Sequence, residues 1–287
     1  MTRTRILAAL VMAPIAIAAI LLLNTPWLAL LAAVLFMGGM WEWYRLADVE
    51  DTLARLVLIT ANLLLMVALV WAGHTGNGGS LVLLQVAVVI GVGWWLLAAL
   101  WLRHYDFGAD HESHARIFKL AAATLAIIPA WAALALVHAG DPEPSRIPGV
   151  QQGHVWLLCA LMTVWAADSG AYFAGRHLGK HKLSPRISPN KTVEGLFGGI
   201  AAGMLVALAM AWLAGTSGWG LLQVAVLALV TVVFSVVGDL YESLIKRHAG
   251  AKDSGDLIPG HGGVLDRIDA VLAALPVFAL GKSLLGL

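Results

Sequence analysis

The sequence has one cysteine among its 287 residues, which excludes an internal disulfide. This residue, Cys159, lies within a long apolar run, and we interpret it as a packing residue. Charged residues are also scarce, at 12% of the chain. Because soluble domains carry about twice that share, the composition excludes an ordinary soluble protein.

Apolar residues make up 60% of the chain, and the mean hydropathy is +0.84. A membrane-spanning helix needs about 20 predominantly apolar residues. We therefore expect an all-α, polytopic integral membrane protein with about nine transmembrane helices. The predicted spans are residues 6–23, 27–44, 56–72, 81–102, 117–138, 155–175, 196–214, 221–244 and 264–284.

The basic residues indicate an orientation. All but two of the 18 lysines and arginines fall on one side of the predicted spans, and Arg146 and Lys282 fall on the other. Cytoplasmic loops carry the excess of positive charge in membrane proteins. The N-terminus is therefore expected in the cytoplasm and the C-terminus on the far side.

The two parts of the chain differ in where they carry polar residues. In residues 1–119 these lie mostly in loops, so we expect transmembrane helices that act as a scaffold facing lipid. Glu42 lies between two tryptophans and is a candidate contact for a substrate headgroup. We favour an interfacial anchor, because tryptophan gathers at the ends of membrane helices. Residues 120–287 are expected to form the catalytic region, with cytoplasmic loops 176–195 and 245–264.

Ionisable residues enter the predicted helices in this second part. Asp168, Tyr172 and Arg176 recur every four residues and share one helix face. Asp239, which begins a polar stripe that ends at Lys246, is expected at a depth similar to that of Asp168. Charged groups inside a membrane are costly and usually mark a functional site.

The loop 176–195 carries five basic residues. Ser188 and Pro189 read as the N-cap and first residue of a helix, with Lys191 in its first turn. A phosphate could dock at this helix N-terminus; attraction of a basic loop to anionic lipid is the other interpretation. The glycines Gly195, Gly199 and Gly203 indicate close helix packing rather than chemistry.

The stretch 243–269 gathers the types of residue that phosphoryl or nucleotidyl transfer needs. Carboxylates hold hard divalent cations, and lysine or arginine neutralises phosphate oxygens. Gly-His-Gly-Gly at 260–263 can bring backbone N–H groups against an anion. Together these residues predict transfer chemistry at a membrane surface.

One extended pattern resembles the signature of the phosphatidate cytidylyltransferase, or CDP-diacylglycerol synthase, family. It runs from Ser243 through Lys246-Arg247, Lys252-Asp253, Ile258-Pro259 and His261-Gly-Gly to Asp266-Arg-x-Asp269. The resemblance continues upstream at Gly238-Asp239, at 188–195 and at Asp168. It implies transfer of CMP from CTP to phosphatidate, which yields CDP-diacylglycerol and pyrophosphate in phospholipid biosynthesis.

The resemblance also implies a cofactor, partners and a location. We expect Mg²⁺, with a monovalent cation such as K⁺ as a second ion. The partners are CTP, phosphatidate and membrane lipid, the assembly is a homodimer, and no nucleic acid is expected. The site should face the cytoplasm from the bacterial inner membrane.

The predicted site residues fall into three groups. The attacking oxygen of phosphatidate is already an anion, so no serine or cysteine nucleophile is needed; the requirement is relief of charge repulsion. Catalytic roles are assigned to Asp239, Asp266, Lys246, His261 and Asp269. Metal binding is assigned to Asp239 and Asp266, with Asp168 as a further candidate. Substrate binding is assigned to Ser188, Asn190, Lys191, Ser243, Arg247, Lys252, Gly262, Gly263 and Arg267.

Two other hypotheses stay open. A related enzyme would use a different lipid-phosphate acceptor or act as a CTP-dependent lipid kinase. A polytopic transporter would also place charges inside the membrane. The lysine-rich, glycine-rich loop on one face and the absence of an inverted repeat count against a transporter.

Overall fold

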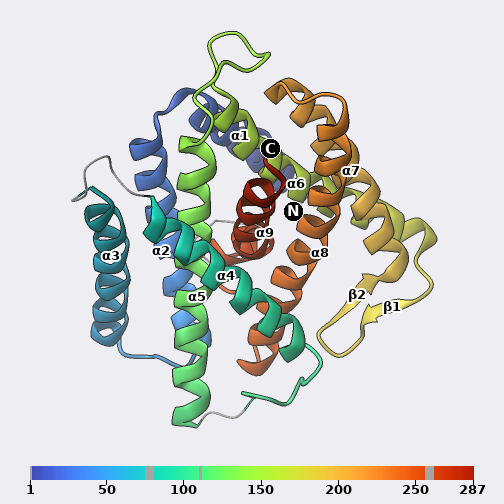
Figure 1. The fold of residues 1–287 in the computed structure, drawn as a ribbon. Helices are drawn as coiled ribbons and strands as arrows, with labels where there is room; N and C mark the ends of the chain where they lie inside the picture. Colours follow the sequence, from blue (N-terminus) through green and yellow to red (C-terminus); the bar gives the residue numbers. More distant parts are fainter. Residues whose placement is uncertain (1, 75–80, 110–111, 256–261) are drawn as a thin grey trace.

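The computed structural model describes residues 2–74, 81–109, 112–255 and 262–287, with the backbone alone for residues 2–11, 73 and 74. These residues form nine helices and one short sheet (Figure 1). The helices are α1 (Thr2–Leu22), α2 (Thr25–Leu46), α3 (Thr52–His74), α4 (Val82–Trp101), α5 (Ser113–Ala139), α6 (Gln152–Leu178), α7 (Val193–Ala214), α8 (Trp219–His248) and α9 (Leu265–Leu285). The strands are β1 (Lys182–Ser184) and β2 (Ser188–Thr192).

The helices coincide with the predicted spans. Eight of the described helices, α2 to α9, are long and apolar enough to cross a membrane. In α1 the apolar segment with described side chains is shorter, at Met12–Leu22. The expected all-α, polytopic membrane architecture is confirmed, with a small β-hairpin added to it.

Helix α9 lies in the middle of the molecule (Figure 1). It packs against α2, α4, α5, α6 and α8, and its residues Ala270 to Phe278 are buried. The first turn of α9 carries Asp266, and Asp269 follows one turn later. The central position of this helix therefore brings both carboxylates next to residues of several other helices.

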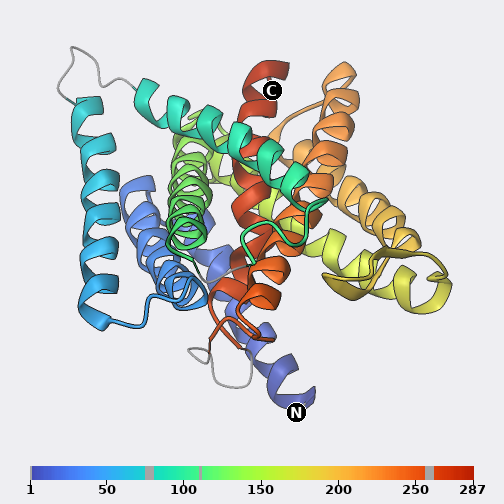
Figure 2. The same cartoon turned by 90° about the horizontal axis from the view of Figure 1, so that it is seen from below.

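Helices α6 and α7 form a tightly packed pair that projects from the bundle on the side opposite α3 (Figures 1 and 2). Glycines permit the close approach. A Cβ atom at Gly199 would lie 2.9 Å from the carbonyl oxygen of Ala167, and one at Gly198 would lie 2.2 Å from the Cβ of Ala174. The interpretation of this glycine repeat as packing is confirmed.

The β-hairpin between α6 and α7 corrects one expectation. Ser188 pairs with Ser184, and Thr192 pairs with Lys182, in an antiparallel sheet. The prediction that Ser188 caps a helix with Lys191 in its first turn is therefore wrong. Thr192 is the N-cap instead, and its hydroxyl accepts a hydrogen bond of 3.1 Å from the N–H of Gly195. Pro189 is tolerated in β2 because both strands of a two-stranded sheet are edge strands.

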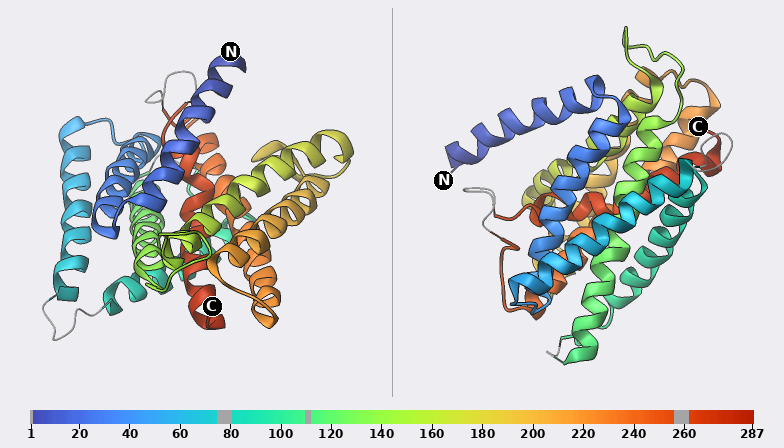
Figure 3. Two further views of the ribbon diagram at one scale, coloured as in Figure 1. Left: turned by 90° about the horizontal axis from the view of Figure 1, so that it is seen from above. Right: turned by 90° about the vertical axis from the view of Figure 1, so that its left-hand side faces the viewer.

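The two termini lie at opposite ends of the molecule (Figures 2 and 3). The N-terminus lies at the end that also carries the connection after α8, at residues 249–255, and the C-terminus lies at the other end.

Candidate functional site

A cavity of about 690 Å³ opens between α6, the β-hairpin, α7 and α8. Five of the predicted site residues line it, from three separate elements: Asp168, Ser188, Asn190, Lys191 and Asp239. Tyr172 and Arg176, predicted on the same helix face as Asp168, line it as well. The structure thus brings together residues up to 71 positions apart in the sequence.

Lys191 and Asp239 form the ion pair of this cavity. The Nζ atom of Lys191 lies 2.5 Å from Oδ2 of Asp239, with the two side chains 23% and 31% exposed. Asp168 interacts electrostatically with both of them and lines the same cavity. The hydroxyl of Ser243 lies 3.5 Å from Oδ1 of Asp239, at the limit of a hydrogen bond.

Asp269 connects this cavity to a second group of charges. Its carboxylate interacts electrostatically with Asp239, Asp168 and Lys191. It also interacts with Glu242, which is buried on α8 with 2% of its surface exposed. Carboxylates from α6, α8 and α9 therefore form one continuous acidic region.

Lys246 is the cation of the second group. Its Nζ atom lies 2.7 Å from Oδ1 of Asp266 and 2.5 Å from Oε2 of Glu242. The Glu242 oxygens have no other hydrogen-bond partner among the described residues. Because a buried carboxylate without a cation is costly, Lys246 stabilises both carboxylates.

The other oxygen of Asp266 is held by the connection that precedes α9. Oδ2 accepts hydrogen bonds from the N–H of Ser254 at 3.0 Å, from the Ser254 hydroxyl at 3.0 Å and from the N–H of Gly263 at 2.9 Å. Gly262 has φ +80°, and a Cβ atom there would lie 2.9 Å from Oδ2 of Asp266. The two predicted glycines therefore shape the turn around this carboxylate.

Glu42 is the residue whose role the sequence did not indicate. It is 2% exposed, and its carboxylate accepts hydrogen bonds from the N–H groups of Val264 and Leu265 at 3.0 and 2.8 Å. The interpretation of Glu42 as part of an interfacial anchor is wrong, because the side chain faces the start of α9. The sequence did contain a signal for this role: a charged residue within an apolar helix needs a polar partner.

The remaining predicted residues lie around these two groups. Arg247 donates to the carbonyl oxygens of Ile187 at 3.4 Å and Ala251 at 3.2 Å, so it joins the end of α8 to the β-hairpin. Lys252 and Arg267 are exposed. His261 lies outside the described residues.

The donor chemistry of the acidic region fits a hard cation. Asp168, Asp239 and Asp269 interact with one another and with a single ammonium group, that of Lys191. Carboxylate oxygens are the ligands that Mg²⁺ prefers. Within the part of the chain that the structure describes, no three acidic, histidine or cysteine side chains already converge on one point. Both oxygens of Asp266 are occupied by Lys246, Ser254 and Gly263.

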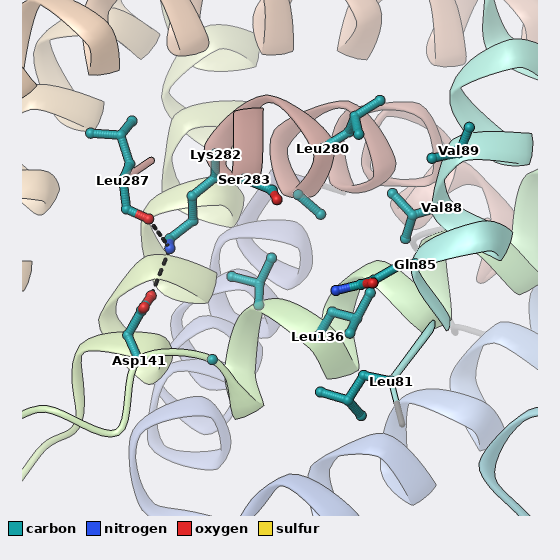
Figure 4. A pocket seen from close by; sticks show the side chains of 13 residues that line it. Leu81, Gln85, Val88, Val89, Leu136, Asp141, Leu280, Lys282, Ser283 and Leu287 are labelled. Carbon is teal, nitrogen blue, oxygen red and sulfur yellow. Dashed lines mark hydrogen bonds and ion pairs between the residues drawn. The ribbon is translucent and has the colours of Figure 1, made fainter. Parts of the chain in front are cut away.

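A separate cavity of about 550 Å³ lies toward the C-terminal end, between α4, α5 and α9 (Figure 4). Lys282 points into it and binds Oδ2 of Asp141 at 2.6 Å and the main-chain oxygen of Leu287. Its other walls are mostly apolar, with Leu136 and Leu280 among them (Figure 4). The lysine is already neutralised, and none of the described residues with a predicted site role lines this cavity.

The fold and the site define a polytopic membrane protein whose charged centre is built on α6, α8 and α9. The sequence model of the cytidylyltransferase family matches residues 3–284, and the chain belongs to this family.

Individual relatives extend the match. The phosphatidate cytidylyltransferase of Pseudomonas aeruginosa is 40% identical over 279 residues, which cover 97% of this chain and 96% of that protein. The phosphatidate cytidylyltransferase of Haemophilus influenzae is 36% identical over 97% of this chain and 98% of its own length. That of Staphylococcus epidermidis strain RP62A is 49% identical over 129 residues, or 44% of this chain and 48% of the relative.

Proposed function

We propose that the protein is a phosphatidate cytidylyltransferase, which transfers CMP from CTP to phosphatidate and forms CDP-diacylglycerol and pyrophosphate. The proposal rests on two neighbouring ion pairs, Lys191 with Asp239 and Lys246 with Asp266. The near full-length relatives support phosphatidate as the acceptor, over another lipid phosphate, and transfer of CMP over a lipid kinase or a transporter.

The reaction requires charge neutralisation and alignment. A phosphate oxygen of phosphatidate attacks the α-phosphorus of CTP and forms the new P–O bond. The bond from this phosphorus to the oxygen bridging it to the β-phosphorus breaks, and pyrophosphate leaves with that oxygen. Since the attacking oxygen is already an anion, no proton must be removed. Lys191 and Lys246 can neutralise phosphate oxygens by exchanging their carboxylate partners for substrate.

We propose Mg²⁺ as the cofactor, with a monovalent cation such as K⁺ as a second ion. Asp239 is the central ligand in this proposal, with Asp168, Asp266 and Asp269 as its neighbours. When bound, the cation would shield the charge of the triphosphate. Asp266 would first have to release Lys246 to contribute an oxygen. His261 is proposed to contact the leaving pyrophosphate.

The proposal includes a location and an assembly. The N-terminus and the site face the cytoplasm of a bacterial cell, where CTP is available, and the protein lies in the inner membrane. The excess of lysine and arginine on the side of the site supports this orientation. The active assembly is proposed to be a homodimer, which light scattering of the purified protein in detergent would test.

The central experiment measures pyrophosphate release by the purified protein and by Asp266→Asn. We expect release from CTP only when phosphatidate and Mg²⁺ are both present, whereas a lipid kinase would release CDP. Asp266→Asn should lose activity while it still accumulates in membranes. Asp106→Asn is the matched control, since its ion pair with Arg186 at 3.0 Å is exposed. Near-normal transfer by Asp266→Asn would refute the catalytic role of this carboxylate.

A further inference from the structure

Glu42 connects the N-terminal helices to the proposed catalytic region. It lies on α2, and its carboxylate accepts a hydrogen bond of 2.9 Å from the hydroxyl of Ser254, 212 residues away in the sequence. It also accepts from the N–H groups of Val264 and Leu265, at the start of α9. A carboxylate at a helix N-terminus is favoured by the free N–H groups and the positive end of the helix dipole.

The surrounding backbone is shaped to admit this carboxylate. A Cβ atom at Gly255 would lie 2.3 Å from Oε1 of Glu42, and one at Gly263 would lie 2.2 Å from Oε2. Any side chain at either position would displace Glu42. One turn further along α2, Arg45 donates to the carbonyl oxygen of Ser254 at 2.7 Å. Helix α2 thus holds the chain at Ser254, after α8, and again at Val264 and Leu265, where α9 begins.

Ser254 relays the contact to Asp266. Its hydroxyl lies 2.9 Å from Oε2 of Glu42 and 3.0 Å from Oδ2 of Asp266, and it is fully buried. A hydroxyl has one proton, so it donates fully to one carboxylate at a time. The N–H of Ser254 also donates to Asp266, so a shift of Ser254 changes both bonds to that carboxylate.

We infer that Glu42 is a positioning residue for the transfer reaction: it fixes Ser254 and the first turn of α9, and thereby directs Asp266 toward Lys246. This inference rests on the proposed role of Asp266. Glu42 itself contacts neither Asp239 nor Lys191 among the described interactions, so its effect must pass through Ser254 and α9.

The first test is Glu42→Gln, assayed for kcat, for KM and for the thermal unfolding midpoint in detergent. A glutamine has nearly the same shape, but its amide group would point a donor at backbone N–H donors. Since hydrogen bonds to a charged group are worth about 1.5–3 kcal/mol, we expect kcat to fall about 10- to 100-fold. The KM for phosphatidate should stay within about twofold. Glu50→Gln, an exposed glutamate that follows α2, is the control and should match the parent protein.

The second test is Ser254→Ala, which removes the relay and leaves Glu42 and its two backbone contacts in place. We expect a loss of kcat of about threefold to tenfold, corresponding to one hydrogen bond. The double variant should lose less than the product of the two single losses, because both act on Asp266. If Glu42→Gln fails to fold, the kcat of Ser254→Ala tests by itself whether the contact from Glu42 to Asp266 affects the reaction.

The outcomes separate the two levels of the proposal. Normal kcat in both Glu42→Gln and Ser254→Ala, with Asp266→Asn inactive, would overturn the positioning role alone. Losses that multiply in the double variant, together with a matching loss of thermal stability, would also overturn it and leave Glu42 as a structural residue. An active Asp266→Asn would instead refute the proposed catalytic role of Asp266, on which this inference rests.

Discussion

Lys191 and Lys246 each serve two or more carboxylates. Lys191 interacts with Asp168, Asp239 and Asp269, while Lys246 binds Glu242 and Asp266. Breaking a partly buried ion pair by removing one partner leaves uncompensated charge, so each lysine has a structural as well as a proposed catalytic role. Substitutions at the two lysines must therefore be assessed for both stability and activity.

Lys191→Gln should lower kcat/KM for CTP at least about 100-fold, because it removes a cation from the cavity and leaves three carboxylates without their shared partner. Steady-state kinetics with varied CTP would measure this. Lys182→Gln, at an exposed position in the same hairpin, should keep parental values. Equal effects of the two changes would show that general loop charge, rather than Lys191, is responsible.

Cys159 is a packing residue in the structure, fully buried, with its sulfur 3.7 Å from the carbonyl oxygen of Ala207. Cys159→Ala should leave turnover within about twofold and cost about 1 kcal/mol of stability, since a small apolar group is replaced by a slightly smaller one. Turnover and thermal unfolding would be measured on the same preparation. A severe loss of turnover would contradict the packing interpretation.

At the scale of elements, the pairing of α6 with α7 determines the cavity. Gly199 and Gly203 let α7 approach α6, and the hairpin that joins the two helices carries Lys191. A wider separation would move Lys191 away from Asp239 on α8. The glycine repeat therefore supports the site through geometry and without taking part in its chemistry.

Gly199→Ala should destabilise the protein by about 1–3 kcal/mol, because the new methyl group would lie 2.9 Å from the carbonyl oxygen of Ala167. Gly93→Ala in α4 is the control, since its added Cβ atom meets nothing within 4 Å. That change should be neutral or stabilise the helix by about 0.5–1 kcal/mol. The thermal unfolding midpoints of Gly199→Ala and Gly93→Ala would be compared. Equal midpoints for the two variants would contradict tight packing at Gly199.

At the scale of the whole molecule, charge is separated between the two ends. The acidic region with its lysines lies near the connection after α8, and the Asp141–Lys282 pair lies near the C-terminus. The first end has charges that interact with several partners, and the second has one neutralised pair. This asymmetry agrees with a site that opens toward a single side of a membrane.

The orientation can be tested with single cysteines in a Cys159→Ala background. Lys252→Cys should react with a membrane-impermeant thiol reagent only when the cytoplasmic face is accessible, as in inverted vesicles. Glu143→Cys, in the connection between α5 and α6, should show the opposite pattern in intact spheroplasts. Labelling of Lys252→Cys from outside intact cells would show that the topology is the opposite of the one proposed.

The class of protein, the positions of the spans and the chemical type of the site followed from the sequence by itself. Hydropathy over about 20 residues is a local property, so the spans could be placed without knowledge of helix packing. The motif around Asp239, Lys246 and Asp266 indicated phosphate and cation chemistry because those residue types allow few other uses inside a membrane.

Only the tertiary structure decided which charges meet. Thr192 rather than Ser188 caps α7 because β2 first pairs with β1. Glu42 reaches Ser254 because α2 packs against α9, a contact between segments more than 200 residues apart. Such contacts depend on how helices pack side by side, and neither local composition nor periodicity records that choice.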